Sequence, residues 1–383
     1  MKNLRLLSLF SGIGAFEKAL ERIGVDYELV NYCEIDKYAS KSYSLIHNES
    51  EDKNLWDITK VDIENLPTNI DLITHGSPCQ DFSIAGKQAG GDEGSNTRSS
   101  LMWNSVEIIR HCKPKYVIWE NVKGVLQKKN VHNFEKYLNV LEDIGYTNYY
   151  KVLNSKDYGI PQNRERIFVV SILDVDLFQF PNPLSTDIKL NDILEHSVEE
   201  KYYTSNELLY KFLQNNNLKF DKTNNNPVSR LGGIFDKDGK VHQSGSVYDK
   251  EYLAPTLTCC QGGYTQPCII ETPCICASRG KNPENPSSRV VGDKNSKQRL
   301  EVNKQGICNT LASVQKDNLV VTNEFRIRKL TPKEFWRLMG FDDQDVEICI
   351  KNGISNTQLY KQAGNSIVVN VLEEIFKNLF DKR

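Results

Sequence analysis

The segment His75–Ser83 reads HGSPCQDFS and places Cys79 directly after a proline, between polar residues. Reactive thiols occupy partly exposed, polar settings of this kind, whereas inert cysteines pack as small apolar side chains. A thiolate can add to an electron-poor carbon and leave again, so Cys79 is a candidate nucleophile. The alternative is a buried structural cysteine.

A carboxyl group and two guanidinium groups are candidates for assisting such a nucleophile. Glu120 follows apolar residues in YVIWENV, a setting that should raise its pKa and let it donate a proton to a ring nitrogen. Capping of the next helix is the alternative, and Asn121 could cap it equally well. Arg164 and Arg166, two apart in QNRER, share one face of a strand and suit a carbonyl oxygen or a phosphate. Ion pairing with Glu165 is the alternative.

Glycines and acids near the N-terminus predict a second site. Gly12 and Gly14 stand between an apolar run and a helical stretch, where backbone N–H groups can approach a ligand. An ordinary tight turn has the same spacing. Glu34 ends the next apolar run, with Asp36 beyond it, and Asp57 follows the next element. Acids at such strand ends accept hydrogen bonds from ribose hydroxyls, and the incomplete GxGxxG pattern favours a nucleoside without phosphates.

The elements that must position these groups alternate apolar runs with amphipathic stretches, which predicts an α/β fold with a doubly wound, Rossmann-like sheet. The expected strands are LRLLSLF, ELVNYCEID, IDLIT, YVIWENV, YYKVLNS and RIFVVSIL. With Asp57 taken to follow another strand, IDLIT is expected to be the fourth. Cys79 would then leave the carboxyl end of a strand, where such sheets bind ligands.

The second half of the chain has a different composition. From about residue 184 to 321 it is rich in Asn, Gly, Pro, Ser and Thr, which predicts a smaller, loop-rich, mostly β module. Helix returns in LTPKEFWRLMGF, where Thr331 can cap and Pro332 fits the first turn, with Trp336 and Met339 as packing residues. A last helix is expected from about 367 to 379, after QAGNS.

The bulk properties exclude several classes of protein. No apolar run in the 383 residues approaches the roughly 18 that span a membrane. The 10 cysteines are spread along a chain too long for a disulfide scaffold, so reduced thiols in a cytoplasm are expected. The net charge of -2 neither supports nor excludes a nucleic-acid partner. We predict no metal, because the cysteines between 259 and 276 form no CxxC pair and have no histidine pair beside them.

Several motifs, in this order, resemble those of bacterial and phage DNA (cytosine-5)-methyltransferases: FSGIG, GSPCQxFS, ENV, QNRER, RKLTPxExxRLMGF and QAGNS. The resemblance covers the N-terminal half and the last sixty residues or so. It implies a catalytic S-adenosylmethionine-binding domain (1–183), a target-recognition domain that includes RKLTPKEFWRLMGF (184–352) and a segment returning to the catalytic domain (353–383).

The resemblance also implies a mechanism. Cys79 adds to C6 of cytosine, Glu120 protonates or hydrogen-bonds N3, Arg166 contacts O2, and Arg164 organises the loop and nearby phosphates. S-adenosyl-L-methionine is the implied cofactor. The positions that match its pocket are Phe10, Ser11, Gly12, Ile13, Gly14, Glu34, Ile35, Asp57, Ile58, Pro78, Leu101, Asn365 and Ser366. Two positions depart from the family: Ala15 stands where many members have glycine, and Ile35 where some have an aromatic residue.

Double-stranded DNA is the implied partner, held between the two domains with its target cytosine rotated out of the helix. The implied DNA-binding residues are Gln80, Ser83, Thr256, Leu257, Gln261, Gly262, Gly263, Tyr264, Thr310 and Leu311. The basic stretch 279–304 suits phosphate contact, although a solvated loop face has the same composition.

The expected activity is sequence-specific DNA cytosine-5 methylation in restriction-modification or phage and host DNA modification. We expect a monomer in the bacterial cytoplasm, without obligatory contact to a cognate restriction endonuclease. An RNA (tRNA) cytosine-5 methyltransferase of the same fold is the alternative. A nucleotide-dependent oxidoreductase would leave Cys79, Glu120 and QNRER unexplained, and a non-catalytic DNA-binding module would not need them.

Overall fold

The computed structural model describes residues 3–78, 91–95, 97–174, 177–205, 207, 227–236, 244–259, 265–271, 274–281, 297–302, 318–321 and 326–380. Between 271 and 325 the description is of the backbone alone. The sequence-derived expectations for Cys79, Gln80, Ser83, Gln261, Gly262, Gly263, Tyr264, Thr310 and Leu311 lie outside the described residues.

A six-stranded sheet forms the centre of the fold, in the order β2-β1-β3-β4-β6-β5. Its strands are β1 (Leu4–Leu9), β2 (Tyr27–Cys33), β3 (Leu72–His75), β4 (Tyr116–Val122), β5 (Tyr146–Asn154) and β6 (Glu165–Leu173). The first four pair in parallel, and β6 runs antiparallel to both β4 and β5. The predicted doubly wound sheet is confirmed. IDLIT is the third strand, not the fourth, because 34–71 contains a helix and three 3-10 turns but no strand.

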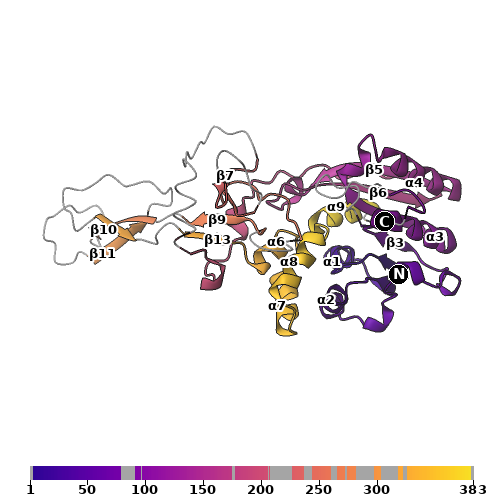
Figure 1. Ribbon diagram of the computed structural model, residues 1–383, viewed down its shortest axis with the longest axis horizontal. Helices are drawn as coiled ribbons and strands as arrows, with labels where there is room; N and C mark the ends of the chain where they lie inside the picture. Colours follow the sequence, from indigo (N-terminus) through magenta and orange to yellow (C-terminus); the bar gives the residue numbers. More distant parts are fainter. Residues whose placement is uncertain are drawn as a thin grey trace.

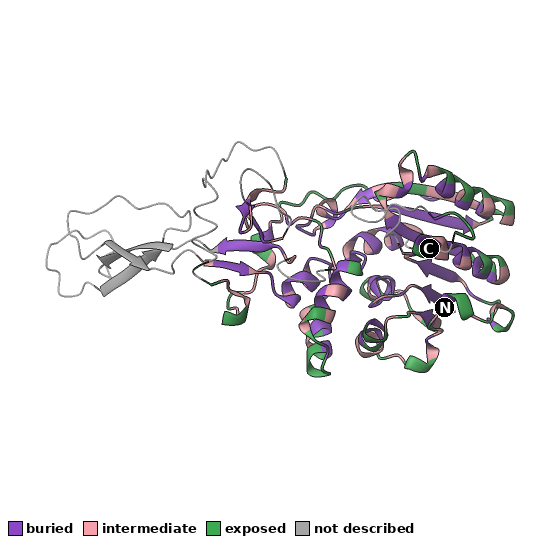
Figure 2. Ribbon diagram, in the orientation of Figure 1, coloured by how far each residue is buried: buried purple, intermediate pink, exposed green. Residues whose placement is uncertain are grey.

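Neighbouring residues along each strand face opposite sides of the sheet and build two separate cores. Leu6 and Ile118 belong to one core, and their neighbours Leu7 and Val117 to the other. Helices α1 (Ala15–Arg22) and α9 (Val369–Phe380) cover the first side, and α3 (Met102–Cys112) and α4 (Val131–Ile144) cover the second (Figure 1). Figure 2 shows the strands buried between these layers, with exposed residues on the outer helix surfaces.

The order of the strands fixes where a site can form. β1 has β2 on one side and β3 on the other, so the chain leaves the sheet in two directions from this point. Open α/β sheets bind ligands at the carboxyl ends of strands beside such a reversal. The residues after β1, β2 and β3 meet at this edge. Helix α2 (Lys37–His47) follows β2 and is capped by the Asp36 carboxylate, which accepts from the Tyr38 and Ala39 N–H groups.

Helices also return near the C-terminus. They are α6 (Pro332–Arg337), α7 (Asp343–Lys351), α8 (Asn356–Asn365) and α9. Thr331 caps α6 and Pro332 lies in its first turn, as predicted, and Glu334 completes a capping box. Trp336 and Met339 are fully buried, in agreement with a packing role, and lie in the core that also contains residues of β1 and α1. QAGN forms the end of α8, and the last helix, expected from about 367, begins at Val369.

A buried ion pair explains part of the RKLTPKE motif. The guanidinium of Arg328, on β13 (Arg326–Lys329), donates to both carboxylate oxygens of Glu334 at 2.9 Å. The side chains are 1% and 0% exposed. Glu334 also accepts from the N–H groups of Thr331 and Glu195. The motif therefore fixes α6 to the strand before it.

Two smaller sheets lie in the predicted recognition region. One has the order β13-β9-β8-β7, with β7 (Arg230–Gly233), β8 (Ser246–Tyr248) and β9 (Cys268–Glu271) around a small apolar core. The other pairs β10 (Cys274–Lys281) with β11 (Lys297–Val302) and β12 (Asn318–Val321). It lies at the end of the molecule away from the six-stranded sheet (Figure 1). Both agree with a mostly β module.

Short 3-10 turns connect many of these elements: η1 (Glu51–Lys53), η2 (Ile58–Lys60), η3 (Ile63–Asn65), η4 (Arg98–Leu101), η5 (Lys123–Leu126), η6 (Ser155–Tyr158), η7 (Leu190–Ile193) and η8 (Glu200–Tyr202). Among the helices that the structure describes, none is long and apolar enough to cross a lipid bilayer.

Candidate active site

The glycine turn after β1 lies against the carboxylate of Glu34. The Gly12 N–H donates to Glu34 Oε2 at 3.0 Å, and the Asp36 N–H donates to Oε1 at 2.7 Å. Gly12 and Gly14 have φ angles of 58° and 81°, the left-handed region that favours glycine. Burial raises the pKa of Glu34, against the opposing effect of these two N–H groups and of Lys361. The predicted glycine and acid residues therefore form one structural unit.

A single side-chain amide holds the next acid beside this unit. Asn54 Oδ1 accepts from the Glu34 and Trp56 N–H groups at 3.0 and 2.8 Å, and Nδ2 donates to the Glu34 carbonyl at 2.9 Å. Asp57 and Ile58 follow at once. We expected Asp57 to end a strand, and this prediction is wrong. The Asp57 carboxylate caps η2 by accepting from the Thr59 N–H and hydroxyl. These bonds lower the pKa of Asp57.

Apolar surface is exposed at the same edge. Ile35 is 70% exposed directly after Glu34, and Trp56 is 42% exposed directly before Asp57. Trp56 has a φ of 60°, an uncommon conformation for a bulky residue. The Cys33 thiol donates to the Trp56 carbonyl at 3.1 Å and helps to hold it. Exposed apolar side chains flanked by two acids suit a flat base bearing a polar sugar.

Glu120 lies near the end of β4, 8% exposed and next to an arginine. Arg166 Nε lies 3.1 Å from Glu120 Oε1. Burial raises the pKa of Glu120, whereas the charges of Arg166 and Arg164 act in the opposite direction. The alternative in which Glu120 caps a helix is wrong, since it lies within the strand and η5 begins three residues later. A buried carboxyl of this kind can hold and donate a proton.

The loop that leads to Cys79 is tethered on both sides of Glu120. Trp119 Nε1 donates to the Ser77 hydroxyl at 3.0 Å, and Asn121 Nδ2 donates to the Ser77 carbonyl at 3.1 Å and to its hydroxyl at 3.2 Å. A Cβ atom added at Gly76 would lie 3.8 Å from Glu120 Oε2. Asn121 is therefore a loop tether rather than a helix cap. Gly76 and Ser77, shortly before Cys79, therefore lie beside Glu120.

The two arginines of QNRER have different surroundings. Arg166 faces Glu120, whereas Arg164 is 4% exposed and its guanidinium donates to three main-chain carbonyls. Nη1 donates to Leu257 at 3.2 Å, and Nη2 to Gly364 and Ser366 at 3.2 and 2.8 Å. Arg164, directly before β6, thus joins the edge of the sheet to the predicted recognition region and to the QAGNS segment. The alternative ion pair with Glu165 is wrong, because Glu165 pairs with Lys123.

The remaining predicted residues fall into three groups. Phe10 and Leu101 are partly buried against the core under α3, and Ile13 and Ile58 are buried. Asn365 Oδ1 accepts from the Cys259 thiol at 2.6 Å, so the C-terminal segment and the recognition region meet there. Thr256 is exposed and donates to the Asn163 carbonyl at 2.6 Å, whereas Leu257 is buried.

Sequence reasoning missed residues whose role depends on contacts distant in the chain. Asn54 and Ser77 hold the strand ends described above, and His47 lies beneath the glycine turn, where its Nε2 is 3.1 Å from the Ile13 carbonyl. None belongs to a quoted motif except Ser77, which GSPCQ contains. Asn54 lies three positions before Asp57 and Ser77 two positions before Cys79, but no comparable signal marks His47.

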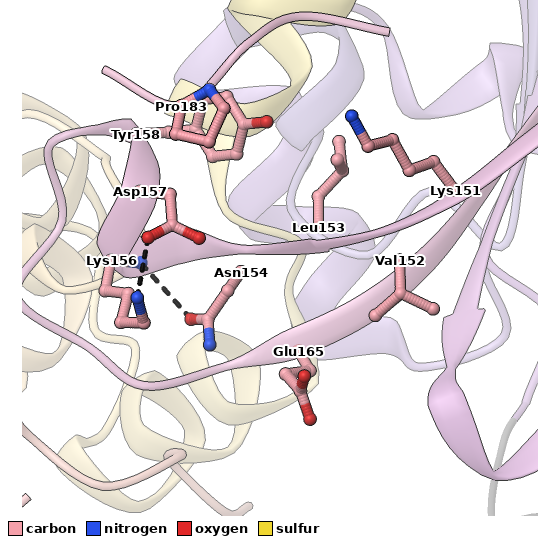
Figure 3. Close-up of a pocket in the computed structure, with 9 residues that line it drawn as sticks. All are labelled: Lys151, Val152, Leu153, Asn154, Lys156, Asp157, Tyr158, Glu165 and Pro183. Carbon is pink, nitrogen blue, oxygen red and sulfur yellow. Dashed lines mark hydrogen bonds and ion pairs between the residues drawn. The ribbon is translucent and has the colours of Figure 1, made fainter. Parts of the chain in front are cut away.

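Away from this edge, the described residues form a hollow but no metal site. A hollow of about 260 Å3 between β5 and η6 is lined by Lys151, Val152, Leu153, Asn154, Lys156, Asp157, Tyr158, Glu165 and Pro183 (Figure 3). None of the predicted site residues lines it. In the part of the chain whose side chains are described, no group of His, Cys, Asp and Glu is arranged to hold a metal ion.

Comparison with known proteins gives a consistent result along the whole chain. The family model described as C-5 cytosine-specific DNA methylase matches residues 4–381. An orphan methyltransferase of Bacillus phage SPR is 35% identical, over 99% of this chain and 98% of the relative. The type II methyltransferase M.HhaI of Haemophilus parahaemolyticus is 32% identical, over 99% and 95%.

Solved structures agree on the fold. The Entamoeba histolytica methyltransferase EhMeth has a TM-score of 0.66 at 18% identity, covering 100% of this chain and 99% of that chain. The Dnmt2 methyltransferase of S. pombe has a TM-score of 0.61 at 19% identity, covering 99% of both chains.

Proposed function

The chain belongs to the C-5 cytosine-specific DNA methylases and is a DNA cytosine-5 methyltransferase, and on this premise we propose how its residues carry out the reaction. The proposed substrate is a cytosine within a specific duplex DNA sequence, rotated out of the helix. The proposed nucleophile is Cys79. The observation that carries the proposal is the tether of Ser77 to Trp119 and Asn121, which holds the chain before Cys79 beside the Glu120 carboxyl.

The edge formed by the glycine turn, Glu34 and Asp57 fits S-adenosylmethionine. The Ser11 hydroxyl is buried and has no hydrogen-bond partner among the described residues, as expected of a group that awaits a ligand. Glu34 would accept from the ribose hydroxyls, Asp57 from the adenine amine, and Ile35 would pack on the base. When bound, the cofactor supplies an electrophilic methyl group. The other proposed cofactor positions are Phe10, Gly12, Ile13, Gly14, Ile58, Pro78, Leu101, Asn365 and Ser366.

Cytosine C5 is too weak a nucleophile to be methylated directly. In the proposed mechanism the Cys79 thiolate forms a bond to C6, and Glu120 donates its proton to N3, so that electron density moves to C5. After methylation, a water molecule takes the C5 proton and the electron pair of that bond forms the C5–C6 double bond. The C6–S bond breaks, the thiolate leaves, and N3 returns its proton to Glu120. The raised pKa of Glu120 suits this role because it keeps the carboxyl protonated at higher pH than an ordinary glutamate.

Arg166 and Arg164 have separate proposed roles. Arg166, beside Glu120, would contact the cytosine O2 and stabilise the charge that develops on the ring. Arg164 already donates to three carbonyls, so we assign it a positioning role at the junction of the two domains. We propose that the enzyme works as a monomer in the bacterial cytoplasm, in restriction-modification or in phage and host DNA modification, without obligatory contact to a restriction endonuclease.

A trapping experiment tests the covalent step. Bisulfite sequencing of plasmid DNA from cells that express the protein would first identify the methylated sequence. A duplex of that sequence with 5-fluorocytosine at the target, incubated with S-adenosylmethionine, should give a covalent protein–DNA adduct. Cys79→Ser should give none. Glu120→Gln should slow adduct formation about 10²- to 10⁴-fold, the range for loss of a general acid.

Two outcomes would overturn the proposal. Adduct formation by Cys79→Ser would show that another residue is the nucleophile. Adduct formation with an RNA of the same sequence, but not with DNA, would assign the chemistry to RNA modification.

A further inference from the structure

His47 lies at the end of α2 and bridges two elements near the proposed cofactor edge. Its side chain is fully buried. Nδ1 lies 2.8 Å from Glu21 Oε1 on α1, and Nε2 lies 3.1 Å from the Ile13 carbonyl in the glycine turn. A carboxylate and a carbonyl both accept hydrogen bonds. Only the doubly protonated imidazolium has an N–H for each of them.

The imidazole also occupies the space under Gly14. A Cβ atom added at Gly14 would lie 2.0 Å from His47 Nε2, so glycine is required here by the contact as well as by its φ of 81°. The ring of Tyr43 packs on the imidazole with a centroid separation of 4.8 Å. His47 therefore packs directly against the turn from Gly12 to Gly14, which the Glu34 carboxylate also holds through the Gly12 N–H.

Two acids surround this histidine. The Glu21 carboxylate also accepts from the Tyr27 hydroxyl at 3.0 Å, and the buried Glu17 carboxylate accepts from the Tyr43 hydroxyl at 2.9 Å. Burial alone would lower the pKa of His47. The bond to Glu21, the charges of Glu17 and Glu21 and the bond to Ile13 raise it instead. The cation is therefore the form that this cluster stabilises.

We propose that protonated His47 is a positioning residue that holds the glycine turn in the shape that binds the methyl donor, so that donor affinity depends on its proton. The inference rests on the proposed function. The chain of contacts is direct: His47 holds the Ile13 carbonyl, and the adjacent Gly12 N–H meets Glu34, the proposed ribose acceptor.

The direction of the pH effect follows from these contacts. Below the raised pKa of His47 both of its hydrogen bonds are present. As the pH rises through that pKa the ring keeps one N–H, so either Ile13 or Glu21 loses its donor and the turn is less constrained. The other groups that face the cluster do not reverse this effect. Burial also raises the pKa of Glu17, and loss of its proton as the pH rises adds negative charge beside His47, which moves the loss of the His47 proton to higher pH without removing it. Tyr27, Tyr43 and Lys18 have raised pKa values and keep their protons over this interval.

Calorimetric titration of the full-length protein with S-adenosylhomocysteine, from mildly acidic to alkaline pH, tests the inference. Wild type should lose affinity about 10-fold as His47 deprotonates, the size expected for one charge-assisted hydrogen bond. His47→Gln should bind more weakly and with a flat alkaline profile. Glu21→Gln keeps an acceptor for Nδ1 but removes the charge, so its midpoint should move to lower pH.

His111→Gln is the matched control, because His111 also contacts a backbone carbonyl, that of Leu66, but away from this edge. Its profile should equal that of wild type. If wild type binds the probe but shows no alkaline loss, or if Glu21→Gln keeps the wild-type midpoint, the role of His47 is refuted while the cofactor assignment stands. If wild type does not bind the probe at any pH, the cofactor assignment itself fails. Thermal melting of each variant separates loss of folding from loss of affinity.

Discussion

Replacement of Asn121 by alanine should slow methyl transfer without weakening cofactor binding. The Asn121 amide donates to the carbonyl and hydroxyl of Ser77, which is 3% exposed. Alanine at this position removes both bonds and leaves the Ser77 carbonyl buried without this donor. The loop before Cys79 would then sample positions away from Glu120, and only the tethered position is competent for the covalent step.

The expected size follows from the buried carbonyl. A buried polar group that loses its hydrogen bond costs about 1–3 kcal/mol. If that cost falls on the tethered position of the loop, its population drops about 5- to 150-fold, because each 1.4 kcal/mol or so is tenfold. The single-turnover rate should fall by the same factor.

Single-turnover methyl transfer with saturating DNA and donor measures this rate, and calorimetry with S-adenosylhomocysteine measures cofactor affinity. Asn148→Ala is a matched control, since Asn148 Nδ2 donates to the Leu138 carbonyl at 3.0 Å in a distant part of the sheet. That variant should keep the wild-type rate. A wild-type rate for Asn121→Ala, or an equal loss of rate and cofactor affinity, would show that the tether does not position the nucleophile.

Three further predictions concern stability and the cofactor edge. Glu334→Ala should lower the free energy of unfolding by about 3–5 kcal/mol in urea titrations, because it leaves the buried Arg328 guanidinium without its carboxylate. Loss of the exposed ion pair between Arg326 and Glu200 should cost at most about 1 kcal/mol, and equal losses for the two changes would contradict the prediction. Trp56 is the exposed member of the four tryptophans, so S-adenosylhomocysteine should quench the fluorescence of wild type but not of Trp56→Phe, and an unchanged quench would place the base elsewhere. Because burial raises the pKa of Glu34, affinity for the same probe should fall as the pH drops through that raised value, and Glu34→Gln should bind weakly with no such acid limb; a limb that persists in the variant belongs to another group.

Strands with long apolar runs were predictable from the sequence, because alternate residues of β1, β3 and β4 fill the two cores of a sheet that is covered on both sides. The segment between α2 and β3 was not. It is a series of 3-10 turns, two of them capped by side chains, with Asn54 hydrogen-bonded to Glu34, and such turns have no periodic pattern. A strand was therefore expected before Asp57 where none exists.

The acids and glycines of the site were predictable because their residue types are unusual at strand ends. The groups that hold them in place were not, since Asn54, His47 and Asn121 act through contacts that join separate elements. In the sequence, His47 is simply a basic residue in the last turn of a helix, which is a common arrangement, and nothing marks its contact with the glycine turn. The i, i+2 spacing of Arg164 and Arg166 predicted a shared face of a strand but could not reveal that Arg166 pairs with Glu120 whereas Arg164 donates to three backbone carbonyls.

The carbonyls that Arg164 contacts make its hydrogen bonds to the predicted recognition region and the C-terminal segment independent of side-chain chemistry. A backbone oxygen is the same atom whatever side chain its residue carries, so these hydrogen bonds set no requirement on the side chains at positions 257 and 366. Position 364 differs, because a Cβ atom there would lie 2.2 Å from the Thr258 carbonyl oxygen. Hybrid enzymes that exchange the intervening region could keep the same seam, provided that the grafted chain enters and leaves at these points. Modularity of this kind would be a property of the main chain, built around one buried cation.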